Sequence, residues 1–215
     1  MTRLAVFDCD GTLVDSQAGI CAAMDAAFAA AALPAPDRHA VRRIVGLSLE
    51  QAIGALIPRE TGARHAEVAA HYRAAFRASR ENGALAEPLY DGIAELLDTL
   101  RARGWLLGVA TGKSDGGLVH CLARHGLSDH FITLQTADRH PSKPHPAMLE
   151  AALAEAGVEP TDAVMIGDTS YDMAMARAAG VRAVGVDWGY HDPAELHEAG
   201  ADVVALTPAE LGELL

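Results

Sequence analysis

The spacing of apolar residues follows two different patterns along this chain. In residues 15–88 their spacing is helical, and one face of the segment SQAGICAAMDAAFAAAAL carries Ile20, Met24, Ala27, Phe28 and Ala31. Asp37 and Ser48 are the expected N-caps of two shorter helices, and residues 63–83 predict a longer helix closed by Asn82 and Gly83. No strand-like alternation occurs between residues 15 and 88, so we expect this stretch to be entirely helical.

Outside this stretch, short apolar runs alternate with helical segments. The runs are LAVF, WLLGVA, FITLQ, AVMIG and VRAVGV, and the expected helices between them cover about 91–104, 114–125, 146–156 and 171–179. This alternation is typical of a parallel sheet with helices on both faces. We therefore predict an α/β fold in which residues 1–14 and 89–215 form a doubly wound parallel sheet. Residues 15–88 would be an all-helical domain inserted after the first strand.

The length and the charge agree with this division. A chain of 215 residues suits one core domain with a sizeable insertion. The net charge is −12, but residues 15–88 hold eight basic and eight acidic residues, so the excess lies in the remainder, with nine basic and twenty-one acidic residues. A strongly acidic protein is a poor binder of nucleic acid or of a membrane surface. A bound cation would belong to the acidic remainder.

The cysteines and the apolar segments indicate a cytoplasmic protein. Residues 21–33 form the longest apolar segment, which is too short for a membrane span and is interrupted by Asp25. The chain runs directly into the first predicted strand, so we expect no signal peptide. Cys9, Cys21 and Cys121 are odd in number and have no C-x-x-C spacing, so neither a disulfide framework nor a zinc site is expected.

Three of the predicted strands end in polar side chains. Asp8 and Asp10 follow the first strand, Thr111 ends the second, and Asp168 follows the strand AVMIG. In open parallel sheets, ligands bind beyond the carboxyl ends of the strands, so these side chains should converge, and Lys143 lies in a loop that could reach them. Carboxylates one residue apart repel each other and are rarely buried unless they are paired or bind a metal. Carboxylates, a lysine, a hydroxyl and backbone N–H groups together suit Mg²⁺ and a phosphoryl group.

The motifs around these residues resemble those of the haloacid dehalogenase superfamily, in particular its phosphoglycolate phosphatase-like branch with a helical cap. DCDGTLVDS resembles the nucleophile motif D-x-D-G-T-L-x-D-S, VATGKS is similar to the second motif, KPHP to the third and GDTSYDMAMARAAG to the fourth. Their order and spacing cover nearly the whole chain. The resemblance implies a Rossmann-like core with residues 15–88 as the helical cap.

The resemblance also implies roles for three aspartates. Asp8 would attack phosphorus and form an aspartyl-phosphate, and Asp10 would protonate the leaving oxygen and then activate water. Mg²⁺ would be held by the Asp8 side chain, the Asp10 backbone carbonyl and Asp168. Without the resemblance, Asp8 and Asp10 could merely shape a turn at the strand end, and Asp168 could cap the following helix.

By the same resemblance, Thr111, the N–H of Gly112 and Lys143 would hold the phosphoryl oxygens, and Asp172 would steady Lys143 or a metal-bound water. Two features depart from the family pattern. Gly112 stands where many relatives carry Asn, and the approach to the lysine, DRHPSKPHP, lacks the common basic-glycine turn. Thr111 could otherwise be a helix cap, and Lys143 a solvated loop residue.

The cap sequence offers two further sets of candidates. Arg73, Arg77 and Arg80 share a helical face and could reach a phosphate-bearing substrate, although such stripes are often only solvated. Arg42 and Arg43 could enter the site when the cap closes.

These features favour a Mg²⁺-dependent phosphatase that acts on a small phosphorylated metabolite, with phosphoglycolate as the first candidate. A phosphosugar mutase, a pyrophosphatase or a nucleotidase could use the same core chemistry, and the cap sequence does not choose between them. Dehalogenation is disfavoured because it needs neither an acid at position 10 nor a metal. A receiver-like or non-catalytic phosphate-binding module is remote, because receivers lack a helical insertion and carry their acceptor Asp in mid-chain. We expect no nucleic-acid or membrane partner, and the oligomeric state stays open.

Overall fold

Within residues 2–215, which the computed structural model describes, six strands form one parallel sheet in the order β3-β2-β1-β4-β5-β6. The strands are β1 Arg3–Phe7, β2 Trp105–Thr111, β3 Thr133–Thr136, β4 Ala163–Gly167, β5 Arg182–Val186 and β6 Val203–Ala205. The strand order reverses between β1 and β4, as in other doubly wound sheets. The predicted fold class is therefore confirmed.

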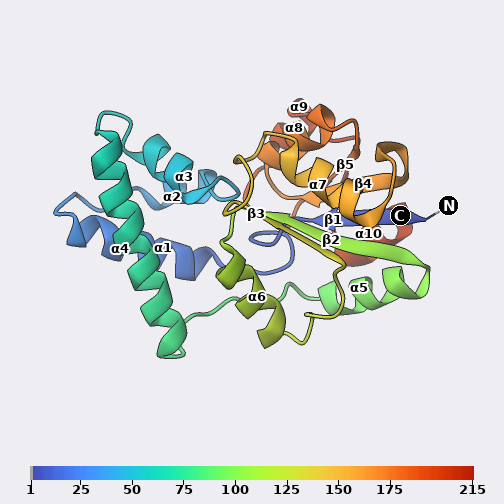
Figure 1. Ribbon diagram of the computed structural model, residues 1–215, viewed down its shortest axis with the longest axis horizontal. Coiled ribbons are helices and arrows are strands. Elements are labelled where there is room, and N and C mark those ends of the chain that lie inside the picture. Colours follow the sequence, from blue (N-terminus) through green and yellow to red (C-terminus); the bar gives the residue numbers. More distant parts are fainter. Residues whose placement is uncertain (1) are drawn as a thin grey trace.

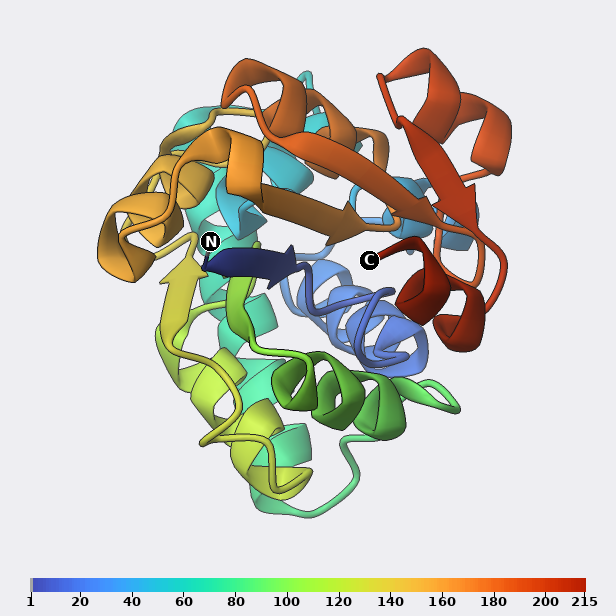
Figure 2. The same cartoon turned by 90° about the vertical axis from the view of Figure 1, so that its right-hand side faces the viewer.

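Both faces of the sheet are covered by helices, and strand β1 shows why. Ala5 and Phe7 point into one apolar cluster, while Leu4 and Val6 point into another on the opposite face, and all four are fully buried. A strand buried on both faces has no polar side, which explains the unbroken apolar run. The first cluster is closed by α5 Ile93–Ala102, α6 Asp115–Arg124 and α10 Pro208–Leu214, and the second by α7 Ala147–Ala156, α8 Ser170–Ala178 and α9 Pro193–Glu198. Figure 2 shows the sheet between these two layers.

The stretch predicted to be helical contains four helices and no strand. They are α1 Gln17–Ala30, α2 Arg38–Arg43, α3 Leu49–Leu56 and α4 Gly62–Glu81, and they lie at one end of the sheet, away from both chain ends (Figure 1). The predicted apolar face of α1 is buried in a cluster of its own, against α4. The caps agree with the sequence: Asp37 accepts a hydrogen bond from the N–H of His39 at 3.0 Å, and Ser48 precedes α3.

The chain leaves the sheet and returns to it at one place. The N–H of Asp15 donates to the carbonyl of Pro88 at 2.9 Å, and the N–H of Tyr90 donates to the carbonyl of Leu13 at 3.1 Å. We refer to residues 15–88 as the helical insert and to residues 82–92 as its return connection. These two hydrogen bonds lie at the predicted boundaries of the inserted domain, after residue 14 and before residue 89. The division into two domains remains a prediction.

No helix or strand is predicted after residue 186, whereas the structure contains α9 Pro193–Glu198, β6 Val203–Ala205 and α10 Pro208–Leu214 there. Strand β6 has three residues and the two helices six and seven, too few for an apolar period to be recognised. Helix α5 covers Ile93–Ala102 within the predicted range of about 91–104, and its N-cap is Gly92, at φ +86°. Within residues 2–215, no helix is long and apolar enough to cross a membrane.

Candidate active site

Three side chains meet where the strand order reverses. Asp8 directly follows β1, Thr111 is the last residue of β2, and Asp168 directly follows β4. Because β1 pairs with both β2 and β4, the ends of these three strands are neighbours. All three side chains are buried. The structure thus brings together the residues that the sequence placed at the strand ends.

Lys143 bridges two of the carboxylates. Its Nζ lies 2.9 Å from Oδ1 of Asp8 and 2.6 Å from Oδ1 of Asp172, and its side chain is 0% exposed. The other oxygen of Asp172 accepts hydrogen bonds from the N–H and the hydroxyl of Thr169 at 3.1 and 2.7 Å. Lys143 is therefore not a solvated loop lysine. We call Asp8, Lys143 and Asp172 the Asp8 cluster.

Asp168 is fixed by two donors from other loops. Its Oδ1 accepts the hydroxyl of Thr12 at 2.7 Å, and its Oδ2 accepts the N–H of Tyr190 at 2.9 Å. A Cβ atom at position 189 would lie 2.1 Å from Cβ of Asp168, so only Gly189 allows this close approach. The alternative role of Asp168 as a helix cap is wrong, since Thr169 is the N-cap of α8.

Asp8, Asp168 and Asp172 each offer an oxygen within 4.8 Å of the others. Burial, reinforced by Asp172 and Asp10 and opposed by Lys143, raises the pKa of Asp8 to about 7. Burial and the charges of Asp8 and Asp172 likewise raise the pKa of Asp168 well above its usual range. Three buried carboxylates facing one lysine leave an excess of negative charge, and Oδ2 of Asp8 is buried without a hydrogen-bond partner. This set of oxygen donors fits a hard divalent cation such as Mg²⁺.

A second lysine bridges the other motif aspartate. Nζ of Lys113 lies 2.9 Å from Oδ1 of Asp10 and 2.5 Å from Oε1 of Glu87, and each of the three side chains is less than 10% exposed. Burial alone would lower the pKa of Lys113, but the negative charges around it, above all Asp10, hold that pKa well above its usual range. The hydroxyl of Ser16 also donates to Oδ1 of Asp10. We call Asp10, Lys113 and Glu87 the Asp10 cluster.

Lys113 and Glu87 were not predicted as site residues, although the composition held a signal. The chain contains two lysines among its 17 basic residues, and each of them bridges two carboxylates at this site. The ammonium of lysine is a compact charge with three donors, which suits a bridge between two separate carboxylates, whereas the planar fork of arginine suits a single one. In a chain whose other basic residues are arginines, the presence of a lysine therefore indicates a candidate site residue.

The glycine that departs from the family pattern has a structural reason. A Cβ atom at Gly112 would lie 2.5 Å from the carbonyl oxygen of Leu47 and 2.8 Å from that of Gly46, both in the helical insert. The neighbouring N–H of Ser48 donates to the hydroxyl of Ser142 at 2.7 Å. Residues 46–48 thus lie directly against the loops that carry Gly112 and Lys143, with no room for a side chain between them.

Thr111 has the position expected of a phosphate ligand. Its hydroxyl accepts the N–H of Lys113 at 3.2 Å, which leaves the hydroxyl proton free to be donated. Ser114, and not Thr111, caps the next helix and accepts the N–H of Gly117 at 3.2 Å. The helix-cap alternative for Thr111 is therefore wrong.

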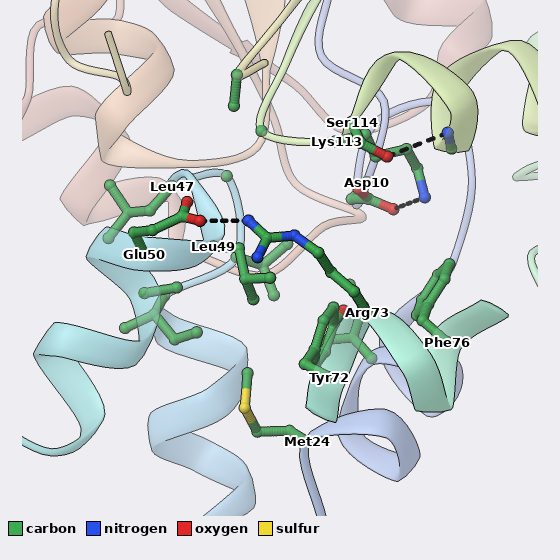
Figure 3. A pocket seen from close by; sticks show the side chains of 18 of the residues that line it. Asp10, Met24, Leu47, Leu49, Glu50, Tyr72, Arg73, Phe76, Lys113 and Ser114 are labelled. Atoms are coloured by element: carbon green, nitrogen blue, oxygen red, sulfur yellow. Dashed lines mark hydrogen bonds and ion pairs between the residues drawn. The ribbon is translucent and has the colours of Figure 1, made fainter. Parts of the chain in front are cut away.

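A cavity of about 340 Å³ lies between the helical insert and the core, beside the Asp10 cluster (Figure 3). Asp10 and Lys113 lie on its core side, and Met24, Tyr72 and Phe76 line it from the insert. The three arginines that the sequence placed on one helical face also line the cavity, namely Arg73, Arg77 and Arg80. Arg73 reaches across to Glu50 and pairs with it.

Arg42 and Arg43 do not line this cavity. Arg42 donates to the carbonyl of Gly189 at 2.7 Å, and Arg43 pairs with Glu195 through two bonds of 2.5 and 2.7 Å. Their observed role is to attach the end of α2 to the core, so the structure does not bring them to the site that the sequence analysis considered for them.

Comparisons with known proteins agree on one family. The model of the haloacid dehalogenase-like hydrolases matches residues 5–186. The probable phosphatase IndB of Dickeya dadantii is 36% identical over 216 residues, which cover 98% of this chain and 92% of that protein. The phosphoglycolate phosphatase of Rhodospirillum rubrum is 35% identical over 207 residues, with coverages of 88% and 81%.

Two further matches extend the comparison. The tyrosine-protein kinase PtkA of Mycobacterium tuberculosis is 35% identical over 216 residues, covering 99% of this chain and 72% of that protein. Among solved structures, a predicted phosphatase from Clostridium acetobutylicum superposes with a TM-score of 0.90 at 26% identity, covering 100% of this chain and 98% of that one.

Proposed function

Because this chain belongs to the haloacid dehalogenase-like hydrolase family and is one of its phosphatases, we propose that it hydrolyses a small phosphate monoester through an aspartyl-phosphate on Asp8. Phosphoglycolate is the first candidate substrate, since relatives about a third identical over most of the chain are named for it.

The observation that carries the proposal is the environment of the Asp8 carboxylate. Its Oδ1 lies 2.9 Å from Nζ of Lys143 and accepts the N–H of Cys9 at 2.6 Å. Its Oδ2 has no hydrogen-bond partner within residues 2–215 although it is fully buried. A buried carboxylate with one oxygen fixed and the other unpaired has the arrangement of an oriented nucleophile.

The reaction follows in two steps. Asp8 attacks phosphorus while Asp10 gives a proton to the leaving oxygen, so the ester P–O bond breaks as the aspartyl-phosphate forms. Asp10 then takes a proton from water, whose oxygen attacks the same phosphorus and releases phosphate from Asp8. The hydroxyl of Thr111, the N–H of Gly112 and Lys143 hold the phosphoryl oxygens throughout.

Mg²⁺ is the metal we propose for this site. The Asp8 side chain, the backbone carbonyl of Asp10 and Asp168 would hold it, while Asp172 positions Lys143, because both oxygens of Asp172 already accept hydrogen bonds. When bound, the ion would offset the negative charge of the carboxylates and of the phosphoryl group.

We further propose that residues 15–88 form a cap domain over a core of residues 1–14 and 89–215. The close contact of residues 46–48 with Gly112 and Ser142 supports a role in excluding water from the site. A cytoplasmic location is part of the proposal, and the three free, buried cysteines support a reducing compartment.

Phosphate release from a substrate panel tests the proposal. The panel comprises phosphoglycolate, sugar phosphates, nucleoside monophosphates, pyrophosphate and para-nitrophenyl phosphate. We expect one small monoester to reach a kcat/KM of about 10⁴ M⁻¹s⁻¹ or more. Activity should vanish with EDTA and return with Mg²⁺, and a chelator-insensitive enzyme would contradict the metal assignment. Conversion of a hexose phosphate to its isomer, with a bisphosphate primer and without phosphate release, would instead identify a mutase.

A further inference from the structure

The Asp8 cluster and the Asp10 cluster have the same arrangement. In each, a buried lysine bridges one aspartate of the first motif and one more distant carboxylate: Lys143 joins Asp8 to Asp172, and Lys113 joins Asp10 to Glu87. The residues on either side of Cys9 are thus each fixed by their own lysine. The Asp8 cluster is part of the catalytic arrangement already described, whereas no role has been given to Lys113 and Glu87.

The surroundings of Lys113 show that it is not a free substrate ligand. Its ammonium group touches Asp10 and Glu87 and lies 5.6 Å from the ring centroid of Phe76. The two carboxylates offset the charge of the ammonium group, and the ring of Phe76 lies near it where it borders the cavity. A buried ammonium held in this way acts on its neighbours rather than on an incoming anion.

The bonds to Asp10 all fall on one oxygen. Oδ1 forms the ion pair with Lys113 and accepts the hydroxyl of Ser16, whereas Oδ2 accepts no hydrogen bond from residues 2–215. Asp10 itself lines the cavity beside the site. The carboxyl group is therefore held at Oδ1, and Oδ2 remains available for the proton that is transferred.

Glu87 is itself anchored to the core. Its carbonyl bonds Nε2 of His125 at 2.7 Å, and two residues earlier the carbonyl of Leu85 accepts from Arg124 at 2.6 Å. Both partners lie at the end of α6, the helix that follows Lys113 in the chain. Glu87 thus provides a fixed second attachment for the ammonium, which keeps Lys113 from following any movement of Asp10 alone.

From this geometry we propose that Lys113, held by Glu87, is the positioning residue of Asp10 and fixes its carboxyl group where it can protonate the leaving oxygen. The inference rests on the acid–base role proposed for Asp10. The consequence can be read in kcat/KM, which reports formation of the aspartyl-phosphate: loss of Lys113 should impair departure of leaving groups that need a proton and should spare those that leave as stable anions.

The test compares two leaving groups in the Mg²⁺-loaded enzyme. Phosphoglycolate has an alkoxide leaving group that requires protonation, whereas dinitrophenyl phosphate releases a stable phenolate. For Lys113→Met we expect kcat/KM to fall about 10²-fold with phosphoglycolate and less than about 5-fold with dinitrophenyl phosphate. If phosphoglycolate is not turned over, the best alkyl phosphate of the panel replaces it. An equal loss on both esters, or no loss on the alkyl ester, overturns the proposal.

Two further variants separate this inference from the proposed function. Asp10→Asn should show the same selectivity for the alkyl ester, and the double variant with Lys113→Met should be no slower on it than Asp10→Asn alone. If Asp10→Asn lowers kcat/KM equally for both esters, the acid role is wrong, and the inference falls with it. If Asp10→Asn is selective and Lys113→Met is not, only the inference is wrong.

A matched control and a second variant complete the design. Arg103→Met removes a partly buried hydrogen bond to the carbonyl of Gly212, and neither residue contacts the Asp10 cluster, so any loss should be equal for the two esters. If Lys113→Met does not fold, Glu87→Gln decides: it keeps an acceptor for Lys113, and we expect a smaller loss, still confined to the alkyl ester. An equal loss on both esters in Glu87→Gln overturns the proposal.

Discussion

The Asp8 cluster and the Asp10 cluster differ in which parts of the chain build them. All three members of the Asp8 cluster come from the core: the end of β1, the loop before α7, and α8. The Asp10 cluster takes Glu87 from the return connection, and Phe76 of α4 covers its lysine. The proposed nucleophile, Asp8, is therefore fixed by the sheet and its helices alone, whereas the proposed acid, Asp10, is fixed at the junction with the helical insert. Substitutions in the two clusters should accordingly have different effects.

The largest effect should come from substitution of Asp8, the proposed nucleophile. Asp8→Asn keeps the shape of the side chain but removes the attacking carboxylate, so we expect kcat to fall about 10⁴-fold or more for every ester, whatever its leaving group. Folding should survive, because the substitution removes one of three crowded carboxylates. Phosphate release and a thermal melt measure the two outcomes. Activity close to that of the unsubstituted enzyme would show that another group attacks phosphorus.

Loss of the other lysine should be smaller and independent of the leaving group. Lys143→Met removes a donor to the phosphoryl oxygens, so we expect kcat/KM to fall about 10³-fold with phosphoglycolate and with dinitrophenyl phosphate alike. The variant also leaves buried carboxylates unpaired, which should cost about 3–5 kcal/mol of unfolding free energy, measured by urea denaturation. A loss confined to the alkyl ester would mean that the two lysines have the same role and would remove the contrast between the clusters.

The smallest effect should come from the contact between the insert and the core. In Gly112→Ala, the added Cβ must displace residues 46–48, since it would lie 2.5 Å from the carbonyl oxygen of Leu47. We expect kcat/KM to fall by about 10-fold to 10²-fold and the amide of Ser48 to exchange its hydrogen faster. Gly116→Ala is the matched control, because its Cβ would meet no atom within 4 Å. If Gly112→Ala and Gly116→Ala have the same kcat/KM, the close contact of residues 46–48 with Gly112 does not contribute to activity.

The sequence predicted the residues that a strand positions. Asp8, Thr111 and Asp168 stand at the ends of apolar runs, and a parallel sheet brings such ends together whatever lies between them in the chain. The sheet, the four insert helices and the close grouping of Asp8, Asp168 and Lys143 could be anticipated in this way. The short elements after residue 186 could not, because three to seven residues are too few for a period to be recognised.

Pairings that depend on the path of a connection were missed. Glu87 reaches Lys113 only because the chain returns from the insert beside residues 13–15, and no local pattern specifies that crossing. The same limit explains Arg42 and Arg43. They were candidates to enter the site when the cap closes, yet they contact the carbonyl of Gly189, in the loop after β5, and the carboxylate of Glu195, in α9.

Because both lysines are buried, chemical modification of their side chains can be used to follow local and global unfolding of the protein. Lys113 and Lys143 are the only lysine ammonium groups in the sequence, and their side chains are 7% and 0% exposed. An amine-reactive ester should therefore leave both side chains unmodified in the folded protein and acylate them as it unfolds. Peptide mapping after brief labelling would follow them separately. Modification of Lys113 before Lys143 would show that the junction with the insert loosens while the core still holds its own lysine.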